Sequence, residues 1–226
     1  MSVIQSTSLA RLLVELHARS DAQIETLRAF ENERSSRARP ASDQEIKQFR
    51  SDKFVALDPD KAEFCYQLCC ATDARRIVEV GTSYGVSTLY LAAAVQDNIA
   101  ARGGHGLVVG TEYEPDKVCA ARTHFDRAGL SQLIELRQGD FRETLRQIKG
   151  PVDFLLIDIW ISMARPALEL VAPHLRGGAV VICDNTDRYR SDYADYFAFL
   201  NDPANGFQTM TLPFGGGLEM SVRRYV

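Results

Sequence analysis

The stretch Glu79-Val80-Gly81-Thr82-Ser83-Tyr84-Gly85-Val86-Ser87-Thr88 lies between an apolar run at 76–80 and a helical pattern at 86–100. A strand, a glycine-containing turn and a helix in this order are typical of a ligand-binding loop in an α/β fold. The loop lacks the third glycine of a dinucleotide-binding loop, and it contains several hydroxyl side chains. Hydroxyl and backbone N–H donors at the start of a helix predict a site for a carboxylate.

Short apolar runs alternate with helical patterns on both sides of this loop. The runs are nearly continuous, as in Val152-Asp153-Phe154-Leu155-Leu156-Ile157, which is typical of strands covered by helices on both faces. We therefore predict a doubly wound, mostly parallel α/β sheet of seven strands with a Rossmann-like arrangement and a C-terminal antiparallel hairpin. The predicted strands are 76–80, 107–112, 133–137, 152–158, 179–183, 207–212 and 218–222, and the predicted helices are 60–72, 86–100, 115–128, 141–148 and 162–174.

The first 50 residues have a different pattern, in which apolar residues recur at helical spacing among charged ones. This pattern predicts two amphipathic helices and a loop over 31–40. We expect residues 1–50 to form a helical extension that serves as a lid or a dimer contact, and residues 51–226 to form the ligand-binding domain. The apolar positions are Leu9, Leu12, Leu13, Leu16, Ile24, Leu27 and Phe30.

The composition limits the function classes. The chain has 226 residues, and its 26 Lys and Arg against 30 Asp and Glu give a net charge of -4, which does not favour nucleic-acid binding. Its five cysteines form no CxxC pair, so we expect reduced thiols. It has no apolar run of about 20 residues and no signal-peptide pattern. We expect a cytoplasmic protein with a small-molecule partner and no membrane partner.

Ligand-type side chains follow the next two predicted strands as well. Glu112, beside Tyr113, ends the second strand, where a carboxylate can accept hydrogen bonds from both hydroxyls of a ribose. Asp140 follows the third strand and is expected either to accept from an adenine amino group or to cap the next helix. Phe141 beside it could pack on the adenine ring. Open α/β sheets bind their ligands at these strand ends.

The chain resembles class I S-adenosylmethionine-dependent methyltransferases, in particular the catechol and caffeoyl-CoA O-methyltransferases. The motifs that carry the resemblance are those described above, together with Leu156-Ile157-Asp158-Ile159-Trp160 and Cys183-Asp184-Asn185. The resemblance covers about residues 58–224. It implies that Ser87 holds the methionine carboxylate, Glu112 the ribose, and that Trp160 packs beside the adenine. The expected cofactor-binding residues are Glu79, Gly81, Thr82, Ser83, Gly85, Ser87, Glu112, Tyr113, Asp140, Phe141, Asp158 and Trp160.

Oxygen ligands follow the fourth and fifth predicted strands. Asp158, Asp184 and Asn185 would meet at one edge of the sheet, and hard oxygen ligands suit Mg²⁺. In metal-dependent relatives these positions hold a divalent cation that orients the acceptor hydroxyl, so we expect Asp158 to be catalytic. The alternative is that Asp158 bonds to loop backbone and that Asp184-Asn185 forms an Asx turn.

The sequence departs from catechol O-methyltransferases at the general base. The lysine of that group, three residues after the first metal ligand, is Ile161 here, so the metal alone, Asp187 or Tyr189 would have to assist proton removal. We predict that a homodimer transfers a methyl group from S-adenosylmethionine to a hydroxyl of a small acceptor, aromatic acceptors included, with help from a divalent cation. A dinucleotide-dependent oxidoreductase and a non-catalytic S-adenosylmethionine-binding protein are the alternatives.

Overall fold

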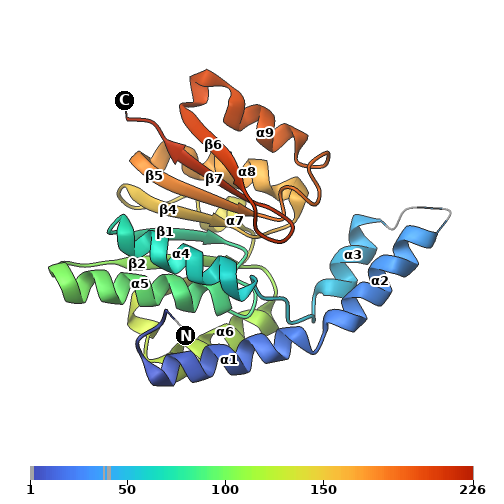
Figure 1. The fold of residues 1–226 in the computed structure, drawn as a ribbon, viewed down its shortest axis with the longest axis horizontal. Coiled ribbons are helices and arrows are strands. Elements are labelled where there is room, and N and C mark those ends of the chain that lie inside the picture. Colours follow the sequence, from blue (N-terminus) through green and yellow to red (C-terminus); the bar gives the residue numbers. More distant parts are fainter. Residues whose placement is uncertain (1–2, 38, 40–41, 226) are drawn as a thin grey trace.

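The computed structural model describes residues 3–37, 39 and 42–225. Its centre is a seven-stranded sheet in the order β3-β2-β1-β4-β5-β7-β6 (Figure 1). β1 to β5 run parallel to one another, and β7 runs antiparallel to both β5 and β6. This arrangement confirms the predicted fold. The strands are β1 (Arg76–Val80), β2 (Leu107–Glu112), β3 (Ile134–Gln138), β4 (Val152–Ile157), β5 (Leu175–Asp184), β6 (Phe207–Leu212) and β7 (Leu218–Arg223).

Helices cover both faces of the sheet because successive strand residues point to opposite sides. Ile77 packs in one apolar core with α4 (Pro59–Ala71), α5 (Val86–Arg102) and α6 (Pro115–Ala128). Its neighbour Val78 packs in the second core with α7 (Phe141–Thr144), α8 (Ile161–Val171) and α9 (Ala194–Asn201). Short 3-10 turns lie at η1 (Ser131–Leu133), η2 (Ala172–His174) and η3 (Pro203–Asn205).

Two helical segments differ from the predicted pattern. α7 ends at Thr144 rather than at 148, and the Arg137 guanidinium donates to the carbonyls of Thr144 and Gln147 beyond that end. α9 has no counterpart among the predicted helices, although its buried Tyr196, Phe197 and Leu200 have helical spacing. Both elements are short, and short helices carry a weak periodic signal.

The described part of residues 1–50 forms three helices instead of the two predicted ones. α1 (Thr7–Asp21) buries its leucines in the first core, while α2 (Ile24–Ser36) and α3 (Asp43–Arg50) form a hairpin that projects from the body of the molecule (Figure 1). The loop predicted over 31–40 is wrong as far as Ser36, because ion pairs such as Arg34–Glu31 support a longer α2. Residues 38 and 40 of that predicted loop lie outside the described residues.

A capping box and an aromatic stack stabilise the hairpin of α2 and α3. The Ser42 hydroxyl accepts from the Glu45 N–H, and the Glu45 carboxylate accepts from the Ser42 N–H, which closes the start of α3. The rings of Phe30 and Phe49 stack in parallel with their centroids 3.8 Å apart. This hairpin therefore has a small apolar contact of its own.

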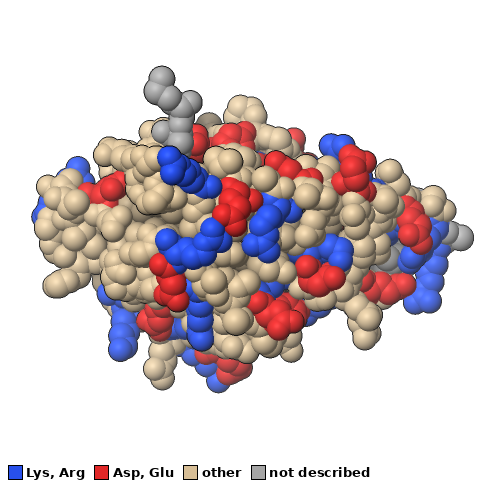
Figure 2. Space-filling view, turned by 90° about the horizontal axis from the view of Figure 1, so that it is seen from below, with Lys and Arg blue, Asp and Glu red and all other residues tan. Residues whose placement is uncertain are grey.

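The surface and the helices agree with the mixed composition. On the face that Figure 2 shows, seen from the side of α1, basic and acidic side chains are interspersed. Pairs such as Arg127–Glu15, with 2.6 Å between nitrogen and oxygen, join α6 to α1. No helix within the described residues is long and apolar enough to span a bilayer.

Candidate cofactor and acceptor site

The turn after β1 approaches the end of β4 very closely at Gly81. A Cβ atom built there would stand 1.9 Å from the carbonyl oxygen of Asp158, and the φ of Gly81 is +101°. Only glycine fits this close approach without moving the backbone. The predicted loop and the predicted residue Asp158 are therefore brought together at the carboxyl edge of the sheet.

Glu79 organises the hydroxyl groups of the same loop. Its fully buried carboxylate accepts from Thr82 Oγ1 at 2.7 Å, Ser87 Oγ at 2.6 Å and Thr88 Oγ1 at 2.5 Å. Burial raises the pKa of Glu79, and the three hydroxyl donors oppose that rise. These hydroxyls, which the sequence suggested as donors to a ligand, are thus bonded to Glu79 and fix the path of the loop.

The start of α5 leaves backbone donors at the mouth of the loop. Gly85 is the N-cap residue with a left-handed φ of +81°, and no side chain caps the helix there. The first turn of a helix has N–H groups without intrahelical partners and a positive dipole end. The remaining predicted hydroxyl, that of Ser83, donates to the carbonyl of Val55 at 3.3 Å. An anion at this position would meet backbone N–H groups.

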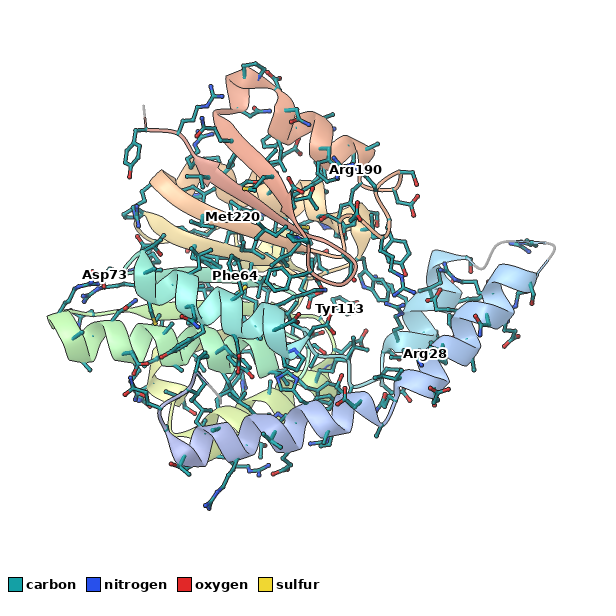
Figure 3. The ribbon with its side chains drawn as sticks, viewed as in Figure 1. Arg28, Phe64, Asp73, Tyr113, Arg190 and Met220 are labelled. Atoms are coloured by element: carbon teal, nitrogen blue, oxygen red, sulfur yellow. The ribbon has the colours of Figure 1, made fainter. Side chains whose placement is uncertain are left out.

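Glu112 is held in place at the end of β2. One carboxylate oxygen accepts from the Ser83 N–H at 2.7 Å and the other from the Glu114 N–H at 2.8 Å. A carboxylate offers about four lone pairs, so half of its acceptor capacity is left. The neighbouring Tyr113, which Figure 3 labels, is 64% exposed. The Lys47 ammonium of α3 lies 5.6 Å from the centroid of its ring.

The third strand end shows a structural role for its acidic residue. Asp140 accepts from the Arg142 N–H at 2.9 Å and caps α7, as the alternative prediction states. The hydrogen bond from the Arg142 side chain lowers the pKa of Asp140. Phe141 is 5% exposed and packs in the second core. Its ring is therefore part of the protein interior rather than of an open ligand surface.

Asp184 at the end of β5 is bonded to a lysine that the sequence analysis did not single out. The Lys61 ammonium lies 2.7 Å from Asp184 Oδ1 and 2.9 Å from Asp58 Oδ2. The second oxygen of Asp184 accepts from the Asn185 amide at 2.7 Å. Burial raises the pKa of Asp184, and the Lys61 charge opposes that rise. Lys61 itself is 1% exposed.

The arrangement around Asp184 does not suit a divalent cation. Both Asp184 oxygens are taken by protein donors, the Asn185 amide presents its NH₂ group to Asp184, and an ammonium already lies between two of the carboxylates. Mg²⁺ requires near-octahedral oxygen ligands and avoids such donors. Among the described residues, no group of three His, Cys, Asp or Glu side chains is arranged to hold a metal ion. Of the predicted ligands, Asp184 is paired with Lys61, and Asn185 is bonded to Asp184.

The α2–α3 hairpin reaches the same edge of the sheet. The Arg50 guanidinium lies 6.0 Å from the Trp160 ring, and the Arg50 carbonyl accepts from Lys117 at 3.2 Å. The Tyr84 hydroxyl donates to the carbonyl of Asp52, so the chain after α3 crosses the loop of Gly81. α3 thus lies beside the two aromatic residues, Tyr113 and Trp160, that the sequence analysis placed near the cofactor.

The residues named as substitute bases lie in the loop after β5. The N–H groups of Asp187 and Arg188 donate to the Gly216 carbonyl at 3.0 and 2.9 Å, which ties this loop to the turn between β6 and β7. Tyr189 is half-buried against the second core. Ile161 begins α8 and is half-buried too. The family lysine is therefore missing at position 161. Lys61 of α4 is an amine that lies at the carboxyl edge of the sheet.

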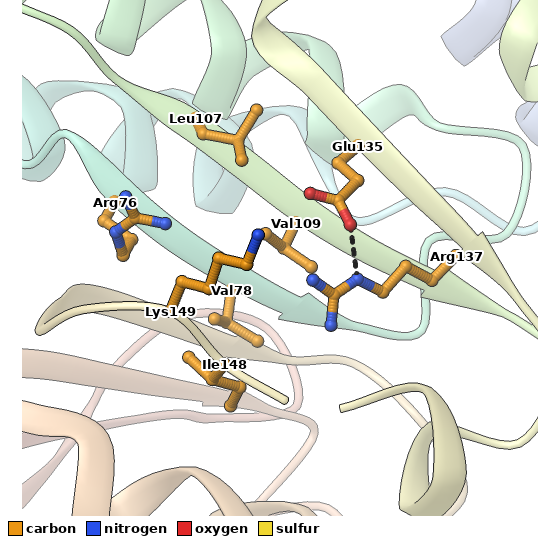
Figure 4. A pocket seen from close by; sticks show the side chains of 8 residues that line it. All are labelled: Arg76, Val78, Leu107, Val109, Glu135, Arg137, Ile148 and Lys149. Carbon is orange, nitrogen blue, oxygen red and sulfur yellow. Dashed lines mark hydrogen bonds and ion pairs between the residues drawn. The ribbon is translucent and has the colours of Figure 1, made fainter. Parts of the chain in front are cut away.

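A small cavity lies away from the site. It has a volume of about 40 Å³ and is bounded by the starts of β1 and β2 and by the segment before β4 (Figure 4). Glu135 and Arg137 form an ion pair beside it, with 2.7 Å between nitrogen and oxygen. This volume can hold a water molecule or two but no substrate.

The comparisons with known sequences point to one class of enzyme. Residues 78–186 match the profile of a methyltransferase domain. A catechol O-methyltransferase of Mycobacterium tuberculosis is 32% identical over 135 residues, which cover 59% of this chain and 58% of the relative. One of Niastella koreensis is 29% identical over 142 residues, which cover 59% of each chain. The chain thus spans less than two thirds of these curated relatives.

Solved structures agree on the fold. The crystal structure of cofactor-bound Rv0187 from MTB superposes with a TM-score of 0.68 at 24% identity, covering 88% of this chain and 97% of that one. The O-methyltransferase of Bacillus cereus in complex with SAH superposes with a TM-score of 0.67 at 22% identity, covering 87% and 97%. These matches confirm the fold.

Proposed function

We propose that this chain, which has the sequence motifs and the fold of a class I S-adenosylmethionine-dependent O-methyltransferase, transfers a methyl group from S-adenosylmethionine to a hydroxyl of a small molecule. The observation that carries the proposal is the carboxyl edge of the sheet, where Gly81, Glu112 and Asp158 meet. The catechol O-methyltransferase relatives support a hydroxylated acceptor. They favour this activity over a dinucleotide-dependent oxidoreductase and over a non-catalytic binding protein.

The cofactor residues fit the two ends of the donor molecule. Glu112 has acceptor capacity left for two ribose hydroxyls, because only two backbone N–H groups occupy it. The uncapped start of α5 after Gly85 suits the methionine carboxylate, so we assign that contact to backbone N–H groups and assign Ser87 to the support of Glu79. Trp160 remains the residue proposed beside the adenine.

The chain's own contribution to the reaction is positioning. S-adenosylmethionine, when bound, supplies an electrophilic methyl group on a sulfonium. Transfer of a methyl group in line needs proximity and orientation more than covalent help from the protein. We assign the orientation of the acceptor hydroxyl to the half-buried Asp158 beside the Gly81 turn. Burial and the charge of Asp184 raise the pKa of this carboxyl group, whose oxygen can accept a hydrogen bond from the hydroxyl in either protonation state.

The acceptor pocket is proposed between α3, the loop after Asp158 and the loop after Asn185. Arg50 and Trp160 mark the first two of these elements, and the turn at Gly216 holds the third. A divalent cation is left out of this proposal, because the Lys61 ammonium is paired with Asp184, one of the predicted ligands. Homodimer formation and the lid role of residues 1–50 remain predictions.

The test is methyl transfer itself. Labelled S-adenosylmethionine is incubated with the chain and a panel of catechols, phenols and hydroxylated acids, and the labelled product is counted. We expect transfer to at least one aromatic hydroxyl and a large fall in kcat for Asp158→Asn. The matched control is Asp116→Asn, an exposed carboxylate in the first turn of α6. Binding of the donor without transfer to any acceptor would favour the non-catalytic alternative.

A further inference from the structure

Lys61 is a lysine on a buried helix face. α4 buries Lys61, Ala62, Cys65 and Cys69 against the sheet, and Lys61 is 1% exposed. Lysines are almost never fully buried unless their charge is paired. Its burial therefore requires a partner of opposite charge inside the protein.

The partners come from two separate elements. Asp58 precedes the first turn of α4, and Asp184, at the end of β5, lies 123 residues after Lys61. The ammonium lies 2.9 Å from one carboxylate and 2.7 Å from the other. Burial acts against the charge, but two carboxylates at hydrogen-bond distance stabilise the ammonium form of the amine. A fixed positive charge thus lies at the ends of β4 and β5.

We propose that the Lys61 ammonium takes the place of a divalent cation at this edge of the sheet, so that the chain binds no metal there. A magnesium ion bound to Asp184 Oδ1 at about 2.1 Å would stand within roughly 5 Å of the ammonium, whose nitrogen is 2.7 Å from the same oxygen. Two cations so close in a buried place repel each other strongly. The ammonium excludes the metal ion unless the lysine leaves.

The same geometry gives the consequence of removing the amine. Without the amine, one carboxylate oxygen of Asp184 becomes free, while the other stays bonded to Asn185. Asp58 and Asp158 then lie nearby without a neutralising charge. Such a group of oxygen donors attracts Mg²⁺ or Mn²⁺. A variant lacking the ammonium should therefore gain a metal site that the natural chain lacks.

The experiment measures Mn²⁺ binding by electron paramagnetic resonance, which needs no substrate and no activity. The variants are Lys61→Met, the double variant Lys61→Met/Asp184→Asn, and Lys149→Met as a control at an exposed lysine before β4. The natural chain and the control are expected to bind Mn²⁺ no more tightly than about 1 mM. Lys61→Met is expected to bind at least about tenfold more tightly, and the double variant should lose that gain.

Two results would overturn the proposal. One is Mn²⁺ binding by the natural chain that Asp184→Asn removes, which can be measured even if Lys61→Met does not fold. The other is a folded Lys61→Met, verified by circular dichroism, that binds Mn²⁺ no better than the natural chain. Because neither readout depends on methyl transfer, failure of this proposal is distinguishable from failure of the proposed activity.

Discussion

Replacing Glu79 by glutamine tests the hydrogen-bonded hub beneath the cofactor loop. Glu79 accepts from three hydroxyls at 2.5–2.7 Å. Glutamine keeps one oxygen and replaces the other by an NH₂ group, so at least one of these buried hydroxyls loses its acceptor, which costs about 1–3 kcal/mol. We therefore expect Glu79→Gln to lower the free energy of unfolding by about 2 kcal/mol.

The assay is urea unfolding followed by circular dichroism, extrapolated to water. For a chain of this size the loss corresponds to a fall in Tm of roughly 4–8 °C. The control is Glu135→Gln, because Glu135 is an exposed strand glutamate whose ion pair with Arg137 contributes about 0–1 kcal/mol. A Glu79→Gln chain no less stable than the Glu135→Gln chain would refute the reasoning.

The same variant predicts a dependence on pH. Burial raises the pKa of Glu79 above its ordinary value of 4.5, so the folded chain binds this proton more tightly than the unfolded chain. The stability that this proton contributes is present at low pH and is lost as the pH rises from 4.5 through the folded-state pKa. Glutamine does not titrate, so the difference between the two chains should shrink over that rise.

Other predictions concern the turn, the first helix and the thiols. Gly81→Ala should lower the free energy of unfolding, measured in urea, by roughly 2–6 kcal/mol, because its Cβ would stand 1.9 Å from a carbonyl oxygen. Gly103→Ala, whose Cβ would meet no atom within 4 Å, should lower it by about 1–2 kcal/mol. Equal losses would contradict this account. In the same assay Leu16→Ala, at a fully buried position of α1, should lower the free energy of unfolding by about 2–5 kcal/mol. Val14→Ala, at a position that is 70% exposed, should change it by less than about 0.5 kcal/mol. A small loss for Leu16→Ala would show that α1 is not part of the core. Iodoacetamide should modify the exposed Cys119 first, and peptide mass spectrometry gives the order in which the cysteines react. Burial raises the pKa of Cys65, so rapid labelling of Cys65 would argue against the packing of α4.

The sheet could be predicted from the sequence because buried parallel strands are continuous apolar runs. β1, β2, β6 and β4 lie within a residue of the predicted positions. The start of β5 at Leu175 was not predicted, since Gly177 and Gly178 interrupt its apolar run. The directions of the loop hydroxyls were not predictable either, although a glutamate inside a buried strand indicates that donors lie near it.

The Lys61 contact was beyond sequence reasoning for a different reason. Asp184 is 123 residues away, and no local pattern pairs the two residues. The sequence held one signal of this burial, because Lys61, Cys65 and Cys69 follow one another at intervals of four residues and so share a helix face. A lysine in an apolar stripe predicts a buried charge, but only the fold identifies its partner. The candidate metal ligands could be predicted from their places at the strand ends. The ion pair of Asp184 with the Lys61 ammonium could not be predicted.

The central claim is that the carboxyl edge of the sheet binds S-adenosylmethionine through Glu112. Calorimetric titration with S-adenosylhomocysteine measures this most directly, with Glu112→Ala and the Glu135→Gln control. We expect one site per chain, and a loss of about 3 kcal/mol, or about 10²-fold in Kd, for Glu112→Ala alone, because hydrogen bonds to a charged acceptor are lost. Equal affinity in Glu112→Ala, or binding of NAD in place of S-adenosylhomocysteine, would contradict the account.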